Sequence, residues 1–301
     1  MSRAIRVVQL SDTHFLEEGA EPEGGHGYDT AEAFDAVLGH LGDQSGVDLV
    51  VVTGDVADHG RAEQYRRAAD SFARFDVPVN VCPGNHDLDA AFGAGMGRPG
   101  VSTSRVILAG SWAFVFVDSS AGLMEPDESG VHIDPPGEER LHSNGRLGPR
   151  EAAWLTGVCD QTTAEHVFVW LHHPPAPGLP LSHDDDYEAE WARLLRGLPG
   201  VRGLGGGHTH VPNEYEFAGR QVFVAPSLKN NFDLETREWL PPGYRSYDFG
   251  ADGSVTSQVH LIDDERWPRH PFGRALHALF MGELSHAELA EIVARRTARG
   301  N

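Results

Sequence analysis

The stretch Val50-Val51-Val52-Thr53-Gly54-Asp55-Val56-Ala57-Asp58 joins an apolar, β-branched run to a glycine and a carboxylate. Such a run predicts a buried strand of the kind found in parallel sheets that are covered on both faces. The strand would carry Asp55 to the carboxyl edge of the sheet. Open α/β sheets bind their ligands at that edge, so Asp55 is the first candidate site residue.

Four further stretches follow the same plan, in which an apolar run ends in polar nitrogen or oxygen donors. These stretches end in Asp12-Thr13-His14, Gly84-Asn85-His86-Asp87, His172-His173 and His208-Thr209-His210. Short polar residues often close strands as turn formers, so one such end would mean little. Five of them, carrying Asp, His and Asn, indicate a shared site. In Asp12-x-His14 and His208-x-His210 the spacing of two places both side chains on one face of an extended backbone, which suits a metal ion.

Together the motifs Asp-x-His, Gly-Asp-x-x-Asp, Gly-Asn-His-Asp, Val-x-x-His and Gly-His-x-His resemble those of the calcineurin-like metallophosphoesterases, whose sites hold two metal ions. Three stretches further resemble the bacterial class III cyclic nucleotide phosphodiesterases and the related glycerophosphodiesterases. They are Gly54 to Asp58, His172-His173-Pro174-Pro175 and Pro242-Gly243-Tyr244-Arg245. The resemblance extends from about Arg6 to about His260, and it is more specific for the superfamily than for the substrate.

The expected fold is α/β, with parallel βαβ units first and hairpins later. Helices are predicted over 31–41, 62–75, 187–198 and from Pro149, and a hairpin is predicted over 106–117. Antiparallel strands over 215–217, 221–224, 244–249 and 254–260 are expected to form most of a second sheet. The resemblance implies a four-layer αββα sandwich, in which two mixed β-sheets are flanked by helices and the metal site lies at the carboxyl ends of the strands.

The resemblance also implies a ligand set for two divalent ions. One ion would bind Asp12, His14, Asp55 and His210, and the other would bind Asp55, Asn85, His172 and His208. Asp55 is the bridge because a carboxylate offers two anionic oxygens. A set of nitrogen and oxygen donors disfavours copper(I) and iron–sulfur clusters and allows Mn, Fe, Co or Zn.

The motifs contain three histidines, His172, His173 and His86, whose roles must be distinguished. Alternation along a strand sends His172 and His173 to opposite faces, and the Val-x-x-His pattern selects His172 as the ligand. His173 is then a structural neighbour or a residue of the rim. His86 follows the ligand Asn85 and should face the cleft, where its family counterpart contacts the phosphate or protonates the leaving oxygen.

The resemblance also implies that Asp58 can hold and orient His86, and the expected catalytic pair is therefore His86 with Asp58. Asn85 and His86 are the expected substrate contacts. The alternative for His86 is a spacer outside the ligand set. Asp87 is expected to accept hydrogen bonds that stabilise its loop.

The chain has 301 residues, of which 40% are hydrophobic, enough for one large core. We expect a single phosphoesterase domain over 1–265, with a surface insertion at 119–148 that is rich in Gly, Pro and acidic residues. The tail over 266–301 contains an amphipathic helix at 285–299, capped by Ser285 with Glu288. This helix can pack on the domain or on a second subunit, as in a homodimer.

The formal net charge of −21 argues against nucleic acid as a partner, because such a field repels polyanions. No run approaches the roughly 18 apolar residues of a membrane helix, and no signal-peptide core follows the first residues. No membrane partner and a cytoplasmic location are therefore expected.

A small phosphate ester is the expected substrate, since two divalent ions would supply local positive charge and a bridging hydroxide as nucleophile. The first hypothesis is hydrolysis of a small diester such as cAMP. The second keeps the site and changes the substrate to a phosphomonoester, a glycerophosphodiester or a nucleoside diphosphate derivative. The third is a non-catalytic scaffold, which would usually lack some of these ligands.

Overall fold

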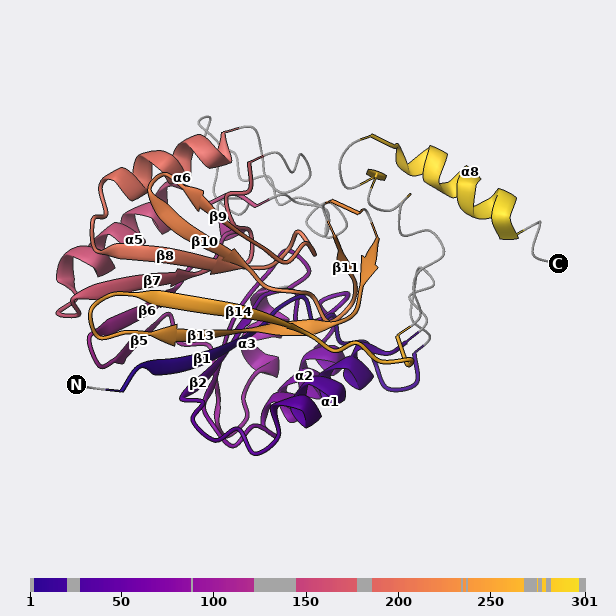
Figure 1. Cartoon of the computed structure of the whole chain (residues 1–301), viewed down its shortest axis with the longest axis horizontal. Coiled ribbons are helices and arrows are strands. Elements are labelled where there is room, and N and C mark those ends of the chain that lie inside the picture. Colours follow the sequence, from indigo (N-terminus) through magenta and orange to yellow (C-terminus); the bar gives the residue numbers. More distant parts are fainter. Residues whose placement is uncertain are drawn as a thin grey trace.

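Two six-stranded β-sheets face each other at the centre of the computed structural model (Figure 1). The model describes residues 3–20, 28–87, 89–121, 145–177, 186–233, 235–236, 238–267, 275, 278–279 and 283–297. Most of the insertion expected at 119–148 therefore lies outside the described residues, as do parts of the C-terminal tail.

The first sheet has the strand order β14-β13-β1-β2-β3-β4. Its strands are β1 (Ile5–Leu10), β2 (Leu49–Thr53), β3 (Val79–Cys82), β4 (Val101–Ser102), β13 (Gly243–Phe249) and β14 (Val255–Leu261). β1 to β4 run parallel, whereas β13 runs antiparallel to both β1 and β14. The predicted buried strand around Val51 is thus confirmed as β2, between β1 and β3.

The second sheet has the strand order β5-β6-β7-β8-β10-β9. Its strands are β5 (Val106–Ala109), β6 (Trp112–Phe116), β7 (His166–Trp170), β8 (Val201–Gly206), β9 (Asn213–Phe217) and β10 (Arg220–Val224). The four central strands, β6, β7, β8 and β10, run parallel to one another. The edge strands β5 and β9 run antiparallel to their neighbours β6 and β10. A short hairpin of β11 (Asn231–Phe232) and β12 (Trp239–Leu240) stands apart from both sheets.

The expectation that 244–249 and 254–260 belong to the second sheet is wrong. These residues form β13 and β14, which extend the first sheet through β1, while β9 and β10 do join the second sheet. Local periodicity predicts that a strand exists but carries no information on its partner. Only the long-range pairing of Val7 with Tyr247 fixes the sheet to which β13 belongs.

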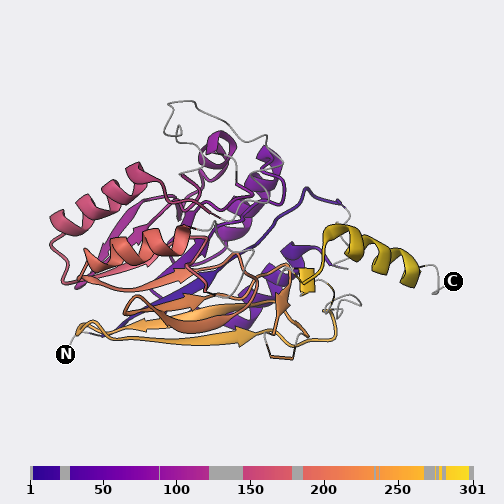
Figure 2. The same ribbon diagram turned by 90° about the horizontal axis from the view of Figure 1, so that it is seen from above.

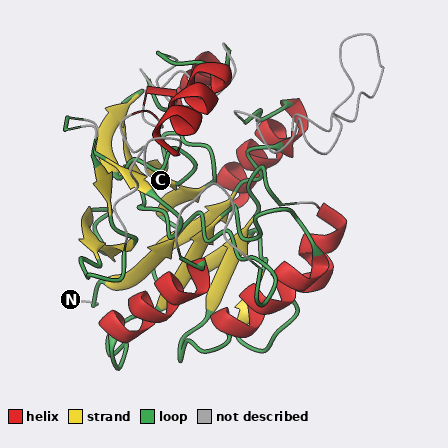
Figure 3. Ribbon diagram, turned by 90° about the vertical axis from the view of Figure 1, so that its right-hand side faces the viewer, coloured by secondary structure: helices red, strands yellow, loops and turns green. Residues whose placement is uncertain are grey.

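Helices cover the outer faces of both sheets (Figure 1, Figure 3). They are α1 (Thr30–Leu41), α2 (Ala62–Phe72), α3 (Asp89–Gly95), α5 (Pro149–Gln161) and α6 (Tyr187–Arg196). α1 and α2 pack on the first sheet through residues such as Phe34 and Phe72, and α5 and α6 pack on the second through Leu155 and Trp191. The expected four layers, helix, sheet, sheet and helix, are confirmed.

Aromatic side chains fill the space between the sheets. Trp112, Phe168, Trp170, Tyr247 and Phe249 are all buried there, and most of their rings meet edge to face. Burial of such large rings stabilises the packing of the two sheets against each other. The carboxyl ends of strands from both sheets are thereby fixed side by side.

The buried guanidinium of Arg245, on β13, ties one sheet to the other. It donates hydrogen bonds to the carbonyl oxygens of Val224 (3.2 Å) and Asn213 (2.8 Å), which belong to the second sheet, and to Oγ of Ser257 (2.6 Å). The Pro-Gly-Tyr-Arg motif therefore has a structural role in joining the sheets.

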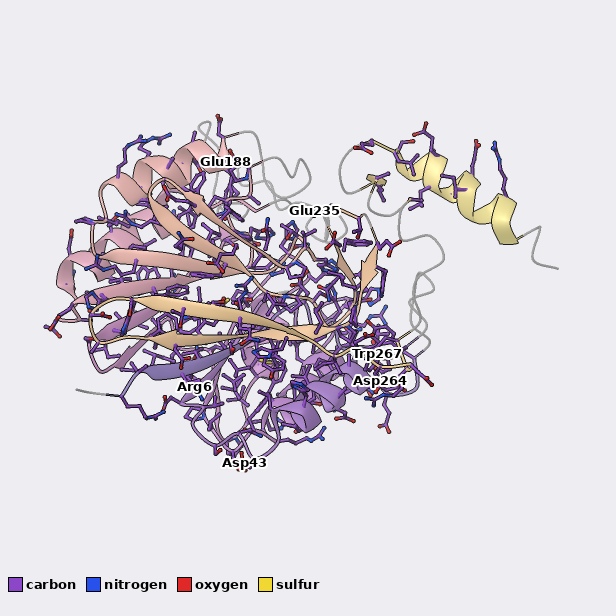
Figure 4. The ribbon with its side chains drawn as sticks, in the orientation of Figure 1. Arg6, Asp43, Glu188, Glu235, Asp264 and Trp267 are labelled. Carbon is purple, nitrogen blue, oxygen red and sulfur yellow. The ribbon has the colours of Figure 1, made fainter. Side chains whose placement is uncertain are left out.

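The C-terminal helix α8 (His286–Thr297) stands away from the sheets (Figures 1 and 2). The predicted capping box is present, because Ser285 and Glu288 exchange main-chain and side-chain hydrogen bonds. At the start of the tail, Trp267 packs on Tyr28, with ring centroids 4.9 Å apart, beside the first-sheet helices (Figure 4). Within the described residues, no helix combines the length and the apolar character needed to span a bilayer.

Candidate metal centre

The five predicted strand ends converge at one place, where the carboxyl ends of the two sheets meet. β1, β2 and β3 of the first sheet and β7 and β8 of the second contribute the donors. Four groups of side chains have potential ligand atoms within 4.8 Å of one another: Asp12 with His14 and His210; Asp12 with Asp55 and His172; His14 with Asp55 and His86; and His172 with His173 and His208.

The backbone at the site is not extended, contrary to the prediction for the two spaced pairs. The residues with left-handed φ are Asp12 (51°), His14 (41°), Asp55 (49°), His208 (64°) and His210 (53°). Non-glycine residues rarely adopt this conformation, and such strained residues concentrate at functional sites. The chain therefore turns sharply after β1, β2 and β8, and these turns direct the five side chains into the site.

Two glycines allow the loops of the site to approach so closely. A Cβ on Gly84 would lie 2.3 Å from Oδ1 of Asp55, and a Cβ on Gly207 would lie 1.8 Å from Oγ of Ser11 and 2.5 Å from Oδ2 of Asp12. Any side chain at these positions would displace a carboxylate of the site. The glycines of Gly-Asn-His and Gly-His-x-His are thus part of the packing around the donors.

Asp55 lies between the two halves of the site. Its Oδ2 atom is 3.5 Å from Nε2 of His14 and 3.2 Å from Nε2 of His172, while its Oδ1 atom accepts a hydrogen bond from the main-chain N–H of His86 (3.0 Å). One carboxylate therefore faces a histidine from each half. This is the position that a bridging ligand needs.

The first half of the site contains Asp12, His14 and His210. Oδ1 of Asp12 lies 3.2 Å from Nε2 of His210, and its carboxylate accepts the main-chain N–H of His208. Nδ1 of His210 donates to the side-chain oxygen of Asn230, which leaves Nε2 directed into the site. Asn230 was not predicted, because it lies in a loop that carries no ligand motif.

The second half contains Asn85, His172 and His208. Nδ1 of His172 donates to the carbonyl of Thr53 (2.8 Å), so its Nε2 faces the site, 3.1 Å from Oδ1 of Asn85. The ring of His208 lies 5.1 Å from that of His172, centroid to centroid. A fixed tautomer of this kind is typical of histidines that bind metals.

His173 also lies within the site, against the expectation that it points to the opposite face. β7 ends at Trp170, so the two histidines follow the strand and no longer alternate. Nε2 of His173 is 3.1 Å from Oδ1 of Asn85, and its Nδ1 is 2.8 Å from Oγ of Ser119. His173 is therefore a buried neighbour of the donors and not a residue of the rim.

The donor set fits divalent cations. Nε2 of His14 is buried and has no hydrogen-bond partner among the described residues, although burial of such an atom is costly. Burial lowers the pKa of His14 to about 4 and that of His208 to about 3, so both are neutral and able to bind a metal. Burial alone would raise the pKa of Asp12, but the neighbouring His210 lowers it to about 2.

His86 is held at the mouth of the site by the main chain of Asp58. Its Nδ1 donates to the carbonyl of Asp58 (2.7 Å), and its Nε2 lies 4.0 Å from Oδ2 of Asp55. The carboxylate of Asp58 does not contact His86 in this way. Its Oδ1 atom lies 2.9 Å from Nδ1 of His14 and 2.6 Å from Nζ of Lys229. Asp58 thus holds His86 through its main chain, and Lys229 is a neighbour that the sequence did not single out.

Asp87 accepts hydrogen bonds from the main-chain N–H groups of Gly84 (2.9 Å), Val56 (3.1 Å) and Ala57 (3.2 Å). The prediction that it stabilises its loop is confirmed. The same carboxylate ties the loop after β3 to the loop after β2, and so fixes Asn85 relative to Asp55.

The metal-free protein is expected to lose stability in mildly alkaline solution. Burial alone would lower the pKa of His172, but Asp55 beside it raises the pKa from 6.5 to about 9. A raised folded-state pKa contributes stability that is complete below pH 6.5 and is lost as the pH rises through about 9. The melting temperature of chelator-treated protein should therefore fall between pH 6.5 and pH 9.

The matched measurement uses His172→Gln, which should show a smaller fall over the same range, and His40→Gln, a distant histidine of α1, which should behave as the wild type. A melting temperature of the wild type that stays level or rises between these pH values would contradict the assignment.

Comparisons with known proteins agree with this geometry. A family model described as calcineurin-like phosphoesterase matches residues 5–212. The 3',5'-cyclic adenosine monophosphate phosphodiesterase CpdA of Escherichia coli is 29% identical over 276 residues, which cover 87% of this chain and 92% of that protein. The protein of the same name from Pseudomonas aeruginosa is 26% identical, with 87% and 91% covered.

Solved structures share the fold at lower identity. A dimetal phosphatase from Danio rerio has a TM-score of 0.55 at 18% identity, with 87% of this chain and all of that chain covered. GAP50, described as the anchor in the inner membrane complex of Plasmodium, has a TM-score of 0.58 at 11% identity, with 89% and 87% covered. Proteins described with different roles thus share this architecture, so function must be argued from the site.

Proposed function

Because this chain belongs to the calcineurin-like phosphoesterase family and is thus a hydrolase, we propose that it is a two-metal phosphodiesterase whose substrate is a small diester, with 3',5'-cyclic AMP as the first candidate. The position of Asp55 supports this proposal most strongly. Its Oδ2 atom lies within 3.5 Å of a histidine from each half of the site.

Seven side chains would hold the metals. Asp12, His14, Asp55 and His210 would bind one ion, and Asp55, Asn85, His172 and His208 would bind the other. Two bound ions supply a nucleophilic water near neutral pH and neutralise charge on the phosphoryl oxygens. The nitrogen and oxygen donors suit Mn, Fe, Co or Zn.

The residues of the chain supply orientation and a proton. The Asp58 carbonyl fixes Nδ1 of His86, so a protonated His86 presents Nε2–H at the mouth of the site, where it can donate to the departing alkoxide. Hydrogen bonds to Thr53 and Asn230 fix the tautomers of His172 and His210, so that each presents Nε2 to a metal.

The choice of a cyclic nucleotide rests on the names of the relatives and not on the Pro-Gly-Tyr-Arg motif. Arg245 of that motif is buried between the sheets and contacts main-chain carbonyls. The motif therefore supports the relationship without indicating a substrate contact. A non-catalytic scaffold is disfavoured because every predicted ligand and His86 lie together in the site.

The experiment compares chelator-treated protein with protein reconstituted with Mn, using cAMP, a glycerophosphodiester, bis-p-nitrophenyl phosphate and p-nitrophenyl phosphate. We expect metal-dependent hydrolysis of cAMP and of the synthetic diester, and little of the monoester. A preference for the glycerophosphodiester or the monoester would replace the cyclic nucleotide with that substrate. Absence of metal-dependent hydrolysis of all four would refute the proposal.

A further inference from the structure

The loop 227–231, which follows β10, touches the metal centre at three points. Oγ of Ser227 donates to the carbonyl of Asp12 (3.3 Å), the side chain of Asn230 accepts from His210, and the ammonium of Lys229 contacts Asp58. All three contacted residues were predicted from motifs, whereas the loop carries no ligand motif.

Hydrogen bonds within the loop and a hydrogen bond from Tyr28 hold the loop in place. Oγ of Ser227 accepts the N–H of Lys229 (2.8 Å), and the hydroxyl of Tyr28 donates to the carbonyl of Lys229 (2.6 Å). The side chain of Asn231 closes the loop, because it accepts from the N–H of Ser227 (2.6 Å) and donates to the carbonyl of Ser227 (2.9 Å). It also donates to the carbonyl of Pro241 (2.9 Å). The main chain of Lys229 is therefore fixed next to Asp58, within reach of its side chain.

Lys229 is the only lysine in the chain; the other basic side chains among the 24 Lys and Arg residues are arginines. Its Nζ atom lies 2.6 Å from Oδ1 of Asp58, and the side chains are only 20% and 6% exposed, respectively. Ion pairs that are this buried hold their partners more firmly than exposed pairs do, because loss of one partner leaves an unpaired buried charge.

The surroundings of Asp58 suit an ammonium better than a guanidinium. Oδ1 of Asp58 also lies 2.9 Å from Nδ1 of His14, a close contact without the alignment of a good hydrogen bond, and Oδ2 lies 3.6 Å from Nδ1 of His59. A planar guanidinium favours both oxygens of a carboxylate at once, whereas a compact ammonium can share one oxygen with a neighbour.

We propose that Lys229 is a positioning residue of the metal centre: its ammonium holds the Asp58 carboxylate against Nδ1 of His14 and so keeps Nε2 of His14 directed at the first metal ion. This inference rests on the proposed metal centre, but not on the identity of the substrate. Groups that orient a metal-binding histidine through its second nitrogen typically change metal affinity by about 10- to 100-fold when they are removed.

The competing explanation is that Lys229 contacts the phosphate of the substrate directly. The two explanations differ in their consequences for the protein without substrate. Loss of a positioning residue weakens metal binding even without substrate, and it does so through Asp58. Loss of a substrate contact leaves metal binding unchanged and raises KM whether or not Asp58 is present.

The test titrates Mn²⁺ into chelator-treated protein by calorimetry, with the stoichiometry checked by elemental analysis. The wild type should bind two ions. Lys229→Met should weaken one of them by about 10- to 100-fold, Asp58→Asn should weaken the same ion, and the double variant should be no weaker than Asp58→Asn alone. Arg61→Met, which removes an exposed cation paired with Glu17, is the matched control and should bind as the wild type does.

Wild-type affinity in Lys229→Met would overturn the inference. So would affinity losses that add in the double variant, or an increase in KM alone. A wild type that binds no Mn²⁺ would instead refute the proposed metal centre, and loss of hydrolysis with intact Mn²⁺ binding would count against the proposed function.

A second measurement does not depend on the folding of Lys229→Met. Labelling with [15Nζ]lysine gives one side-chain resonance, since the chain has a single lysine. The resonance should move in Asp58→Asn and stay unchanged in Arg61→Met. A resonance that Asp58→Asn leaves unmoved would show that the ion pair does not form in solution, which also overturns the inference.

Discussion

Replacing Asp55 by asparagine is expected to remove both metal ions and to lower kcat/KM by about 10³-fold or more. Metal ions supply several kcal/mol of transition-state stabilisation in such reactions, and each 1.4 kcal/mol or so corresponds to a factor of about ten. Oδ2 of Asp55 faces His14 and His172 at once, so its loss affects both halves of the site. An amide offers a single neutral oxygen and cannot bridge two cations.

The measurement combines elemental analysis with steady-state rates on a diester. Asp118→Asn is the matched control, because Asp118 also follows a strand, β6, but accepts a hydrogen bond from Ser120 N–H (2.9 Å) and matches no metal motif. We expect this variant to keep both ions and most of its rate. An Asp55→Asn protein that retained two ions would rule out the bridging role.

His86→Ala should lower the rate on cAMP by about 10²- to 10⁴-fold while both metals stay bound, as expected when a general acid is lost. The main-chain carbonyl of Asp58 fixes Nδ1 of His86, and the side chain is 21% exposed, so Nε2 can reach a substrate. The loss should be smaller for bis-p-nitrophenyl phosphate, because p-nitrophenolate departs without a proton more readily than a ribose alkoxide does.

This difference between leaving groups separates general acid catalysis from a purely structural effect, which would lower both rates equally. His40→Ala, at the end of α1, is the matched histidine control and should leave both rates unchanged. The ring of His86 also lies near His14 and Asp55, so loss of a metal ion in His86→Ala would instead make His86 a ligand.

The sequence predicted which side chains meet, but not the backbone that brings them together. The runs before Asp12, Asp55, Asn85, His172 and His208 all proved to be strands, three in the first sheet and two in the second. The carboxyl ends of these strands meet at the site. The carboxyl ends of neighbouring parallel strands lie close together whatever conformation the following loops adopt. For this reason the convergence of the donor residues could be predicted. The left-handed φ values that follow the strands depend on tertiary packing, which residue spacing does not reveal.

Contacts from distant loops were beyond prediction for a related reason. Asn230 and Lys229 come to the site because β10 lies next to β8 in the second sheet, and no local pattern states that adjacency. His173 was misplaced because alternation was applied beyond the end of β7. In each case the sequence contained the residue, and the missing information was the pairing or the end of a strand.

The place of β1 in the first sheet has a consequence for biosynthesis. β1 is synthesised long before its antiparallel neighbour β13, which begins only at Gly243. Until that segment emerges, one side of β1 offers unpaired main-chain groups, and exposed strand edges promote aggregation. This side of β1 therefore stays unpaired in the nascent polypeptide until β13 has been synthesised, and a chaperone that shields this edge would raise the yield of folded protein.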